Sequence, residues 1–172
     1  MTGINVINID VSKDPGWDRF VTKHPRATIY HHSSWKEVLE KTYGYEACYL
    51  ASSDQNNNIS AGLPLFYIKS RITGNRFVSL PFSHFCDPLV DSQEELTVLV
   101  KQSNVIQRMK HNSYLELRAF DSRCISSELR FQKQQLHKLH ILKLDKTIHS
   151  IFDSFHRSCI QRAVLKAEKS QL

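Results

Sequence analysis

Residues 63–68, Leu-Pro-Leu-Phe-Tyr-Ile, are apolar or aromatic at every position. Successive side chains of a strand point to opposite faces of a sheet, so a strand of this composition must be covered on both faces. We therefore predict that this stretch is a central strand, with other elements packed above and below it. Pro64 has no N–H to donate to a neighbouring strand, and it predicts a bulge or an unpaired edge at that point.

The rest of the chain supplies elements that suit such a sheet. Alternating apolar residues bounded by turn residues predict strands at residues 4–9, 45–52, 59–72, 75–82, 114–120 and 136–144. Apolar residues at helical spacing, preceded by capping residues, predict helices that begin at Asp14-Pro15, between His31 and Ser34, at Ser92 and at Thr147. The predicted fold class is α/β (α+β), a mixed, largely antiparallel sheet flanked by helices, with a C-terminal basic amphipathic helix.

The terminal helical pattern, residues 147–170, has an apolar stripe that changes direction. Its first part carries apolar residues on one face: Ile148, Ile151, Phe152, Phe155 and Cys159. Its second part carries apolar residues roughly 100° around the axis, at ~3.6 residues per turn: Ile160, Ala163, Val164 and Ala167. No Gly or Pro closes the pattern, so we expect the second stripe to be covered by a neighbour, such as a second domain that the given sequence lacks.

Positive charge is concentrated in the same part of the chain. The net charge is +6; residues 1–129 contain 14 Lys/Arg and 14 Asp/Glu, whereas residues 130–172 contain 9 and 3. Clustered cations attract phosphates, nucleic acid or anionic lipid head groups. We therefore predict an anion-binding surface made of Arg157, Arg162, Lys166 and Lys169. A solvated basic helix face is the alternative.

The cysteines, histidines and glycines indicate no metal or nucleotide site. The four cysteines, Cys48, Cys86, Cys124 and Cys159, lack the close pairs that zinc sites use, and we expect them to be buried thiols. A metal or a Cys–His nucleophile within the loop that holds His84 and Cys86 is the weaker alternative, because adjacent residues rarely converge without a distant third partner. The five glycines include no G-x-G arrangement, which argues against a phosphate cradle.

The hydropathy pattern indicates no membrane span. The first residues are polar, and no apolar run approaches the ~18 residues that a transmembrane helix needs. The expected location is therefore cytoplasmic.

A segment rich in Pro, Phe and Asp, residues 79–91, separates a predicted strand from a predicted helix. Ligand sites often form at such places, and we expect the aromatic loop at residues 81–88 to be buried. An Asp at a strand end can act as a general base, which makes Asp87 and Asp91 candidate catalytic residues. An Asp before a proline or a helix is equally typical of a turn or a cap, and that alternative stays open.

Three patches of the sequence stand out together. The first contains Trp17-Asp18-Arg19-Phe20-Val21, His24-Pro25, Ile29-Tyr30-His31, Trp35 and Gly44-Tyr45. The second contains Ala61-Gly62-Leu63-Pro64-Leu65, Lys69-Ser70, Gly74 and Val78-Ser79-Leu80-Pro81-Phe82. The third contains Arg157, Ile160, Arg162-Ala163 and Lys166-Ala167-Glu168-Lys169. In this order, and over nearly the whole chain, they resemble the N-terminal half of the FemAB-like acyltransferases. This GNAT-type family includes peptidoglycan-bridge aminoacyl transferases and exopolysaccharide-associated relatives.

The resemblance implies an organisation in which two GNAT-like domains make one enzyme. Residues 1–146 would form the GNAT-like N-terminal domain, and residues 147–172 a helix leading to the missing C-terminal GNAT-like domain. The implied function is transfer of an acyl or aminoacyl group to an amine of a cell-envelope or polysaccharide precursor. The donor of the full-length protein would be acyl-CoA or aminoacyl-tRNA, with no cofactor bound in this segment. The isolated chain would be inactive.

The resemblance also implies site residues. Trp35, Lys36 and His84 would bind a small-molecule or sugar-linked acceptor, Lys36 as a phosphate ligand. Asp91 would act as the base, with Asp87 as a second catalytic candidate. The family often has a glycine pair after the Pro-Phe patch, where this chain has Phe85-Cys86-Asp87.

A different class of function is also open. The chain could be a non-catalytic module that binds an anionic partner, RNA or a membrane surface, through its basic C-terminal helix. RNA-binding modules usually place stacking aromatic residues beside their cations, whereas Phe152 and Phe155 fall on the apolar stripe. A self-associating structural domain is a third interpretation.

Overall fold

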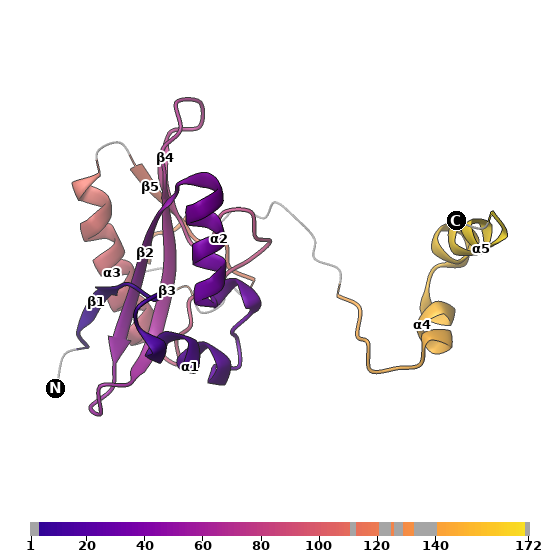
Figure 1. Ribbon diagram of the computed structural model, residues 1–172, viewed down its shortest axis with the longest axis horizontal. Helices are drawn as coiled ribbons and strands as arrows, with labels where there is room; N and C mark the ends of the chain where they lie inside the picture. Colours follow the sequence, from indigo (N-terminus) through magenta and orange to yellow (C-terminus); the bar gives the residue numbers. More distant parts are fainter. Residues whose placement is uncertain (1–3, 111–112, 121–124, 126–128, 133–140, 171–172) are drawn as a thin grey trace. The chain divides into compact units, whose positions relative to one another are not determined.

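The computed structural model of the chain describes residues 4–110, 113–120, 125, 129–132 and 141–170. The chain divides into two compact units, Met1–Gln132 and Lys133–Leu172 (Figure 1). The first unit holds the sheet, and the second holds the terminal helical pattern. The domain boundary expected after residue 146 stays a prediction.

The first unit is built on a five-stranded sheet in the order β1-β2-β3-β4-β5. Its strands are β1 (Val6–Ile9), β2 (Glu46–Ser53), β3 (Ile59–Ile68), β4 (Asn75–Val78) and β5 (Ser113–Glu116). Neighbouring strands are antiparallel except β4 and β5, which run parallel. The predicted mixed, largely antiparallel sheet is confirmed.

β3 is the central strand that the sequence predicts, and its residues 61–68 are buried. β4 pairs only with the last part of β3, from Phe66 onward, whereas Gly62 pairs with Leu89. Backbone N–H groups two residues apart in a strand point to the same edge, so the nitrogen of Pro64 faces the same edge as the N–H groups of Gly62 and Phe66. Pro64 therefore lies between the pairing of Gly62 with Leu89 and the pairing of Phe66 with β4. No strand pairs with β3 on this edge at Pro64, so the missing N–H costs no hydrogen bond between strands. The predicted unpaired edge is confirmed.

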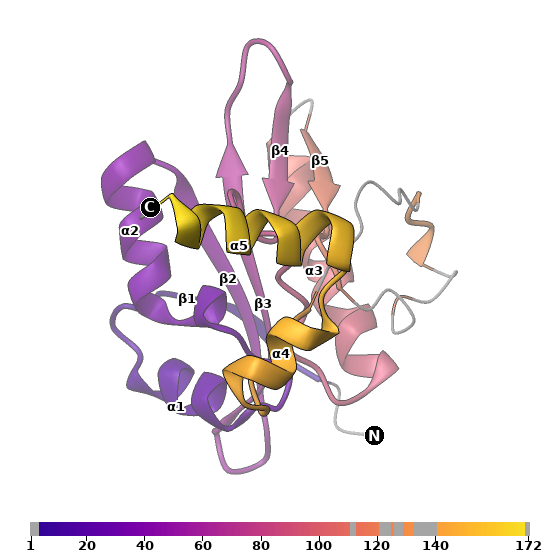
Figure 2. The ribbon, with the colours of Figure 1, turned by 90° about the vertical axis from the view of Figure 1, so that its right-hand side faces the viewer.

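Helices cover both faces of the sheet. On one face lie α1 (Pro15–Lys23) and α2 (Ser33–Tyr43), joined through the 3₁₀ turn η1 (Ile29–His31). On the other face lies α3 (Gln93–Met109) (Figure 1). Figure 2 shows the face that carries α1 and α2.

Local sequence signals define the ends of these helices. Asp14 accepts the N–H of Gly16 at 2.8 Å and begins α1. Gly44 ends α2 with a φ of 66°, a left-handed conformation that glycine adopts without strain. Ser92 and Glu95 form a capping box at the start of α3. The three helices predicted in this part of the chain are therefore confirmed.

Trp17 fills the centre of the core between the sheet and α1. Its side chain is completely buried, its ring meets that of Tyr49 edge-on at 5.2 Å, and its Nε1 donates to the carbonyl of His31 at 2.7 Å. Gly62 lies against the indole, since a Cβ added there would stand 2.6 Å from Cζ3 of Trp17. Real Cβ contacts are never so short, so the close approach of α1 to β3 requires glycine at this position.

The second unit contains two short helices in place of the single helix predicted for residues 147–170. Helix α4 (Ile148–Ser154) ends where the backbone becomes extended at Phe155, and a π-helical turn, η4 (Arg157–Gln161), leads into α5 (Arg162–Lys169). The predicted C-terminal basic amphipathic helix is present, but it is interrupted between its two apolar stripes, which face different directions. A break between them lets each stripe find its own orientation.

The cysteines and the last predicted strand differ in part from expectation. Cys48 and Cys86 are buried, as predicted, but Cys159 is exposed because it lies on the short π-helical turn, which has no core of its own.

Residues 141–144 form no strand, while residues 136–140 and Cys124 lie outside the described residues.

Candidate functional site

The segment between β4 and α3, residues 79–91, leaves the sheet at Ser79 and returns beside the chain that follows β5. Ser79 donates its N–H to the carbonyl of Glu116 at 3.0 Å, and its Oγ accepts the N–H of Arg118 at 2.9 Å. Cys86 then donates its N–H to the carbonyl of Arg118 at 2.7 Å. The hydroxyl of Ser79 thus accepts the N–H of Arg118 in place of a backbone carbonyl. The regular hydrogen bonding between strands stops here, which explains why β4 ends earlier than the sequence predicts. The intervening residues project from the sheet between two fixed points.

Most of the 79–91 segment is buried, as predicted, but Phe82 and His84 are exposed. Phe82 is 58% exposed and has a φ of 60°, a region that residues other than glycine rarely adopt. His84 is also exposed, whereas Ser83 is buried and donates its Oγ–H to the carbonyl of Leu80 at 3.0 Å. The left-handed turn at Phe82 directs its ring outward. Backbone strain of this kind is commonest at binding sites.

His31 joins the start of α2 to the 79–91 segment. The ring is completely buried, and its Nδ1 accepts the N–H of Thr28 at 3.1 Å. The ring proton is therefore on Nε2, which lies 2.9 Å from the carbonyl oxygen of Asp87 and 3.4 Å from the Sγ of Cys86. His31 thus holds the 79–91 segment against α2 as a neutral hydrogen-bond donor.

The structure gives Cys86 a histidine neighbour, but His31 takes that place rather than His84. Cys86 is completely buried, and burial raises the pKa of its thiol far above the ordinary range. A neutral, inaccessible thiol is no nucleophile, so this pair serves packing. Among the described residues, no three His, Cys, Asp or Glu side chains gather as a metal site.

Asp87 and Asp91 lie in different surroundings. Asp87 is only 6% exposed, and its carboxylate accepts the N–H of Phe120 at 3.0 Å. The Asp91 side chain is 81% exposed, and its Oδ1 lies 3.7 Å from the Nε2 of His24. Of the two, Asp91 is the carboxylate that a substrate in solution can reach. The catalytic roles of both remain predictions.

His24 is a partner of Asp91 that the sequence did not single out as a site residue. Its Nδ1 accepts the N–H of Arg26 at 3.2 Å, which leaves the proton on the Nε2 that faces Asp91. The ring packs edge-on against Phe20 at 5.5 Å, and burial lowers the pKa of the imidazole. The two residues are far apart in sequence, and only the fold brings the end of α1 to the start of α3.

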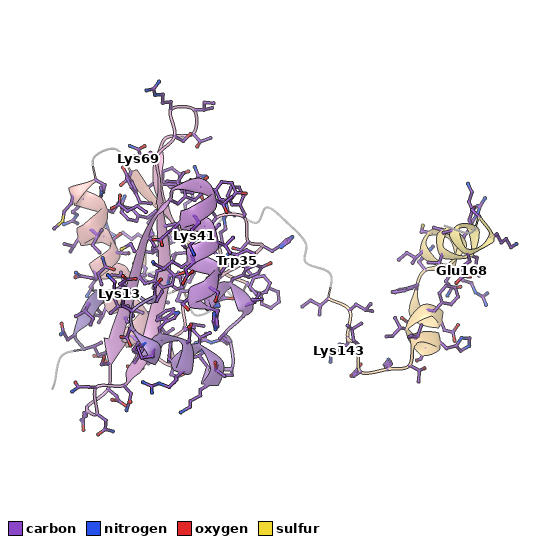
Figure 3. The ribbon with its side chains drawn as sticks, viewed as in Figure 1. Lys13, Trp35, Lys41, Lys69, Lys143 and Glu168 are labelled. Carbon is purple, nitrogen blue, oxygen red and sulfur yellow. The ribbon has the colours of Figure 1, made fainter. Side chains whose placement is uncertain are left out.

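Trp35 and Lys36 are adjacent in α2 but contact different groups. Trp35, labelled in Figure 3, is half-buried. It packs edge-on against Tyr30 at 5.2 Å. Lys36 is 8% exposed, and its Nζ lies 2.8 Å from a carboxylate oxygen of Glu40 and 3.4 Å from one of Asp10. A phosphate would have to compete with these carboxylates for the ammonium group. Phosphate binding by Lys36 remains a prediction.

An exposed aromatic surface, made of Tyr43, Tyr45 and Phe82, was not predicted. The rings of Tyr43 and Phe82 lie 4.6 Å apart, and those of Tyr43 and Tyr45 are stacked at 5.5 Å. Beside them is a hollow of about 190 Å³ that the side chain of Lys69 also lines. The sequence could not indicate this surface, because only the fold brings the end of α2 next to the 79–91 segment.

The predicted anion-binding residues all lie in the second unit. Arg157, Arg162, Lys166 and Lys169 surround one hollow of about 440 Å³. The structure therefore brings together all four cations that the sequence grouped. Their binding of an anion remains a prediction.

The buried histidines predict acid sensitivity. Burial lowers the pKa of both His24 and His31 below the ordinary 6.5. The unfolded chain therefore binds more protons than the folded chain once the pH falls below about 6.5, and folding stability decreases toward acid. Each histidine that stays neutral removes up to about 1.4 kcal/mol per pH unit from the free energy of unfolding. Urea unfolding at pH 7.5 and 5.5 measures this difference.

His24→Gln is expected to reduce this pH dependence, because it removes one of the two buried imidazoles. The matched control is His149→Gln, which makes the same substitution at an exposed position. Equal stability of the unsubstituted chain at both pH values would contradict the assignment of both rings as buried and neutral.

Comparisons with known proteins identify the fold of the chain. No protein-family model and no curated protein sequence matches the chain. Among solved structures, the chain is similar to FemX, with 18% identity and a TM-score of 0.50, over 63% of this chain and 25% of FemX. It is similar to an acetyltransferase from Trypanosoma brucei, with 12% identity and a TM-score of 0.55, over 81% of this chain and 99% of that protein. A protein described as a probable acetyltransferase is matched over its full length, with 12% identity and a TM-score of 0.51.

These matches support the predicted GNAT-like fold. At such identities the likeness concerns the fold alone. The chain spans about a quarter of the length of FemX, whereas it spans the whole of the two acetyltransferase structures. None of the described helices is long and apolar enough to cross a membrane.

Proposed function

We propose that this chain is the N-terminal domain of a FemAB-like N-acyltransferase. In this proposal, the complete enzyme moves an acyl or aminoacyl group to an amine of a cell-envelope or polysaccharide precursor. The observation that carries it is the GNAT-type fold, which is shared with a quarter of FemX as well as with whole acetyltransferases. The ordered sequence patches resemble the FemAB-like family, and they favour a function like that of FemX over a function like that of the whole acetyltransferases.

The proposed chemistry needs a proton acceptor near the attacking amine, because only a neutral amine attacks an activated ester. Asp91 suits this role, since its carboxylate is exposed and the 79–91 segment that carries it is fixed at several points. His24, with its proton on the Nε2 that faces Asp91 at 3.7 Å, would orient the carboxylate. We propose Asp91 as the base and His24 as its positioning residue.

Asp87 fits a supporting role in the same proposal. It is buried, it accepts the N–H of Phe120, and its carbonyl lies within hydrogen-bond distance of the His31 ring. These bonds hold the 79–91 segment in place between α2 and the chain after β5. Asp87 thus positions the segment, and Asp91 acts at its end.

The acceptor would lie against the surface that α2 and the 79–91 segment share. Trp35 and His84 are partly or fully exposed there and can contact a sugar-linked acceptor. The aromatic surface of Tyr43, Tyr45 and Phe82 adds ring faces of the kind that pack against sugars or bases. Lys36 would have to leave Glu40 and Asp10 to reach a phosphate, so we propose that it mainly anchors α2. The donor in this proposal is acyl-CoA or aminoacyl-tRNA.

Tryptophan fluorescence tests the proposed acceptor surface. The chain has two tryptophans, of which Trp17 is completely buried and Trp35 is half-buried. Titration with a sugar-linked acceptor that carries a free amine is expected to give a saturable change in emission. The change should vanish in Trp35→Phe, which keeps Trp17 as the remaining fluorophore.

Two outcomes would contradict the proposal. One is a fluorescence change of equal size in Trp35→Phe, because binding would then lie elsewhere. The other is acyl transfer from acyl-CoA or aminoacyl-tRNA by residues 1–172 alone, because the proposed active site needs a second domain.

A further inference from the structure

The second unit carries a concentrated patch of positive charge on η4 and α5. Its cations, the basic patch, are Arg157, Arg162, Lys166 and Lys169, and they surround one hollow. Glu168 is the single acidic residue between positions 157 and 170. None of the four cations forms an ion pair with a carboxylate of the described residues. The patch therefore attracts anions with little internal compensation.

Exposed apolar side chains accompany this charge on the same short helical segment. Ile160 is 44% exposed, Val164 36% and Leu165 48%. At ~100° per residue, Ala163, Ala167 and Val164 lie roughly 100–160° around the axis from Arg162, Glu168 lies next to Val164, and Leu165 borders the cations. The segment is therefore amphipathic, with its cations on one side and most of its apolar side chains on the other. Both sides face solvent in the unit as described.

Gln161 fixes the shape of this unit. Its side-chain Nε2 donates to the carbonyls of Phe152 and Phe155, each at 3.0 Å, and these are carbonyls at the end of α4. The side chain thereby satisfies acceptors that a helix C-terminus leaves open and holds the bend between α4 and the π-helical turn. Near the start of α4, Ile148 is 87% exposed. The bend gives the unit two separate exposed apolar sites in addition to its cations.

We propose that this C-terminal unit docks on an anionic lipid surface, with α5 lying in the plane of the head groups. Acidic head groups match the basic patch, and the acyl boundary takes up the exposed apolar side chains, as in other interfacial amphipathic helices. Single-stranded RNA would use the same cations, but RNA-binding surfaces add aromatic rings for stacking. Residues 157–170 contain no aromatic residue. The combination of cations and aliphatic side chains favours lipid.

Vesicle binding by the chain 1–172 tests this proposal. Vesicles of equal parts phosphatidylglycerol and phosphatidylcholine are expected to bind the chain, and pure phosphatidylcholine vesicles are not. Raising the salt from about 0.05 M to about 0.5 M should weaken binding strongly, because exposed charges are then screened. The double variant Arg162→Glu/Lys166→Glu should lose at least about tenfold in affinity. Its matched control, Arg71→Glu/Lys101→Glu, makes the same charge change at exposed positions of the first unit and should bind as before.

A second variant separates lipid from other anionic partners. Ile160→Gln/Val164→Gln keeps the charge and uses a good helix former, and it should lower vesicle affinity at least about fivefold. Retention of full vesicle affinity in this variant would overturn the proposal. So would the absence of vesicle binding at low salt, or binding of a single-stranded RNA through Arg162 and Lys166 without binding of vesicles. Circular dichroism of each variant verifies that the helices are retained.

Discussion

Replacing Trp17 with alanine is expected to lower the free energy of unfolding by about 3–5 kcal/mol. The indole is completely buried, it meets Tyr49 edge-on, and it donates a hydrogen bond to the carbonyl of His31. The substitution therefore leaves a cavity between α1 and β3 and removes the donor for a buried carbonyl. Because that carbonyl belongs to the residue that holds the 79–91 segment, the candidate site should loosen as well.

Urea unfolding followed by circular dichroism measures this loss. The control is Trp35→Phe, which changes a half-buried tryptophan and is expected to shift stability by less than about 1.5 kcal/mol. A loss below about 1 kcal/mol in Trp17→Ala would mean that the indole is not the centre of this core.

Replacing Gly62 with alanine is the second large effect that we expect. The added methyl group would meet two carbon atoms of the Trp17 ring at 2.6 and 2.7 Å. The ring is completely buried and held by its hydrogen bond to His31, so a shift away from the methyl group would disturb that bond and the surrounding packing. The expected loss of stability is about 1–3 kcal/mol, the usual range for overpacking.

A double-mutant cycle shows whether this clash is the cause. In the Trp17→Ala background, the two ring atoms that clash with a Cβ at Gly62 are gone, and the remaining neighbour, Cε1 of Phe20 at 3.4 Å, is far less crowded. Gly62→Ala should then change stability by less than about 0.5 kcal/mol, and the difference between the two backgrounds is the coupling energy. An equal loss in both backgrounds would place the effect of Gly62→Ala in the backbone of β3 instead.

Much of the first unit was predictable because local sequence signals mark its central strand and the ends of its helices. The apolar stretch at 63–68 could only be a central strand, and Asp14, Gly44 and the Ser92–Glu95 pair mark helix ends through their own chemistry. These features depend on residues close in sequence. Periodicity and capping therefore suffice to find them.

The terminal helix was predicted but its interruption was not, because periodicity alone cannot locate a break. The rotation of the apolar stripe was visible in the sequence, but no Gly or Pro marks the bend at Phe155. The bend depends on the side chain of Gln161, which bonds to carbonyls six and nine residues earlier. Such side-chain caps carry no strong sequence signature when the cap is a glutamine.

The candidate site was predictable only in part for a similar reason. The sequence indicated the 79–91 segment and its two aspartates, but not that Asp91 pairs with His24 or that His31 lies against Asp87. It also did not show that Phe82 turns outward in a left-handed conformation. Each of these contacts joins residues from separate elements, and only the completed sheet brings those elements together.

The most direct measurement of the proposed function is an amide-resolved NMR titration of the chain 1–172 with a sugar-linked acceptor that carries a free amine. If the first unit holds the acceptor, the largest shifts will cluster around Trp35 and along the 79–91 segment, and they will saturate together. Shifts confined to the C-terminal unit, or no saturable shifts at all, would contradict the proposal that this chain forms the acceptor side of an acyltransferase.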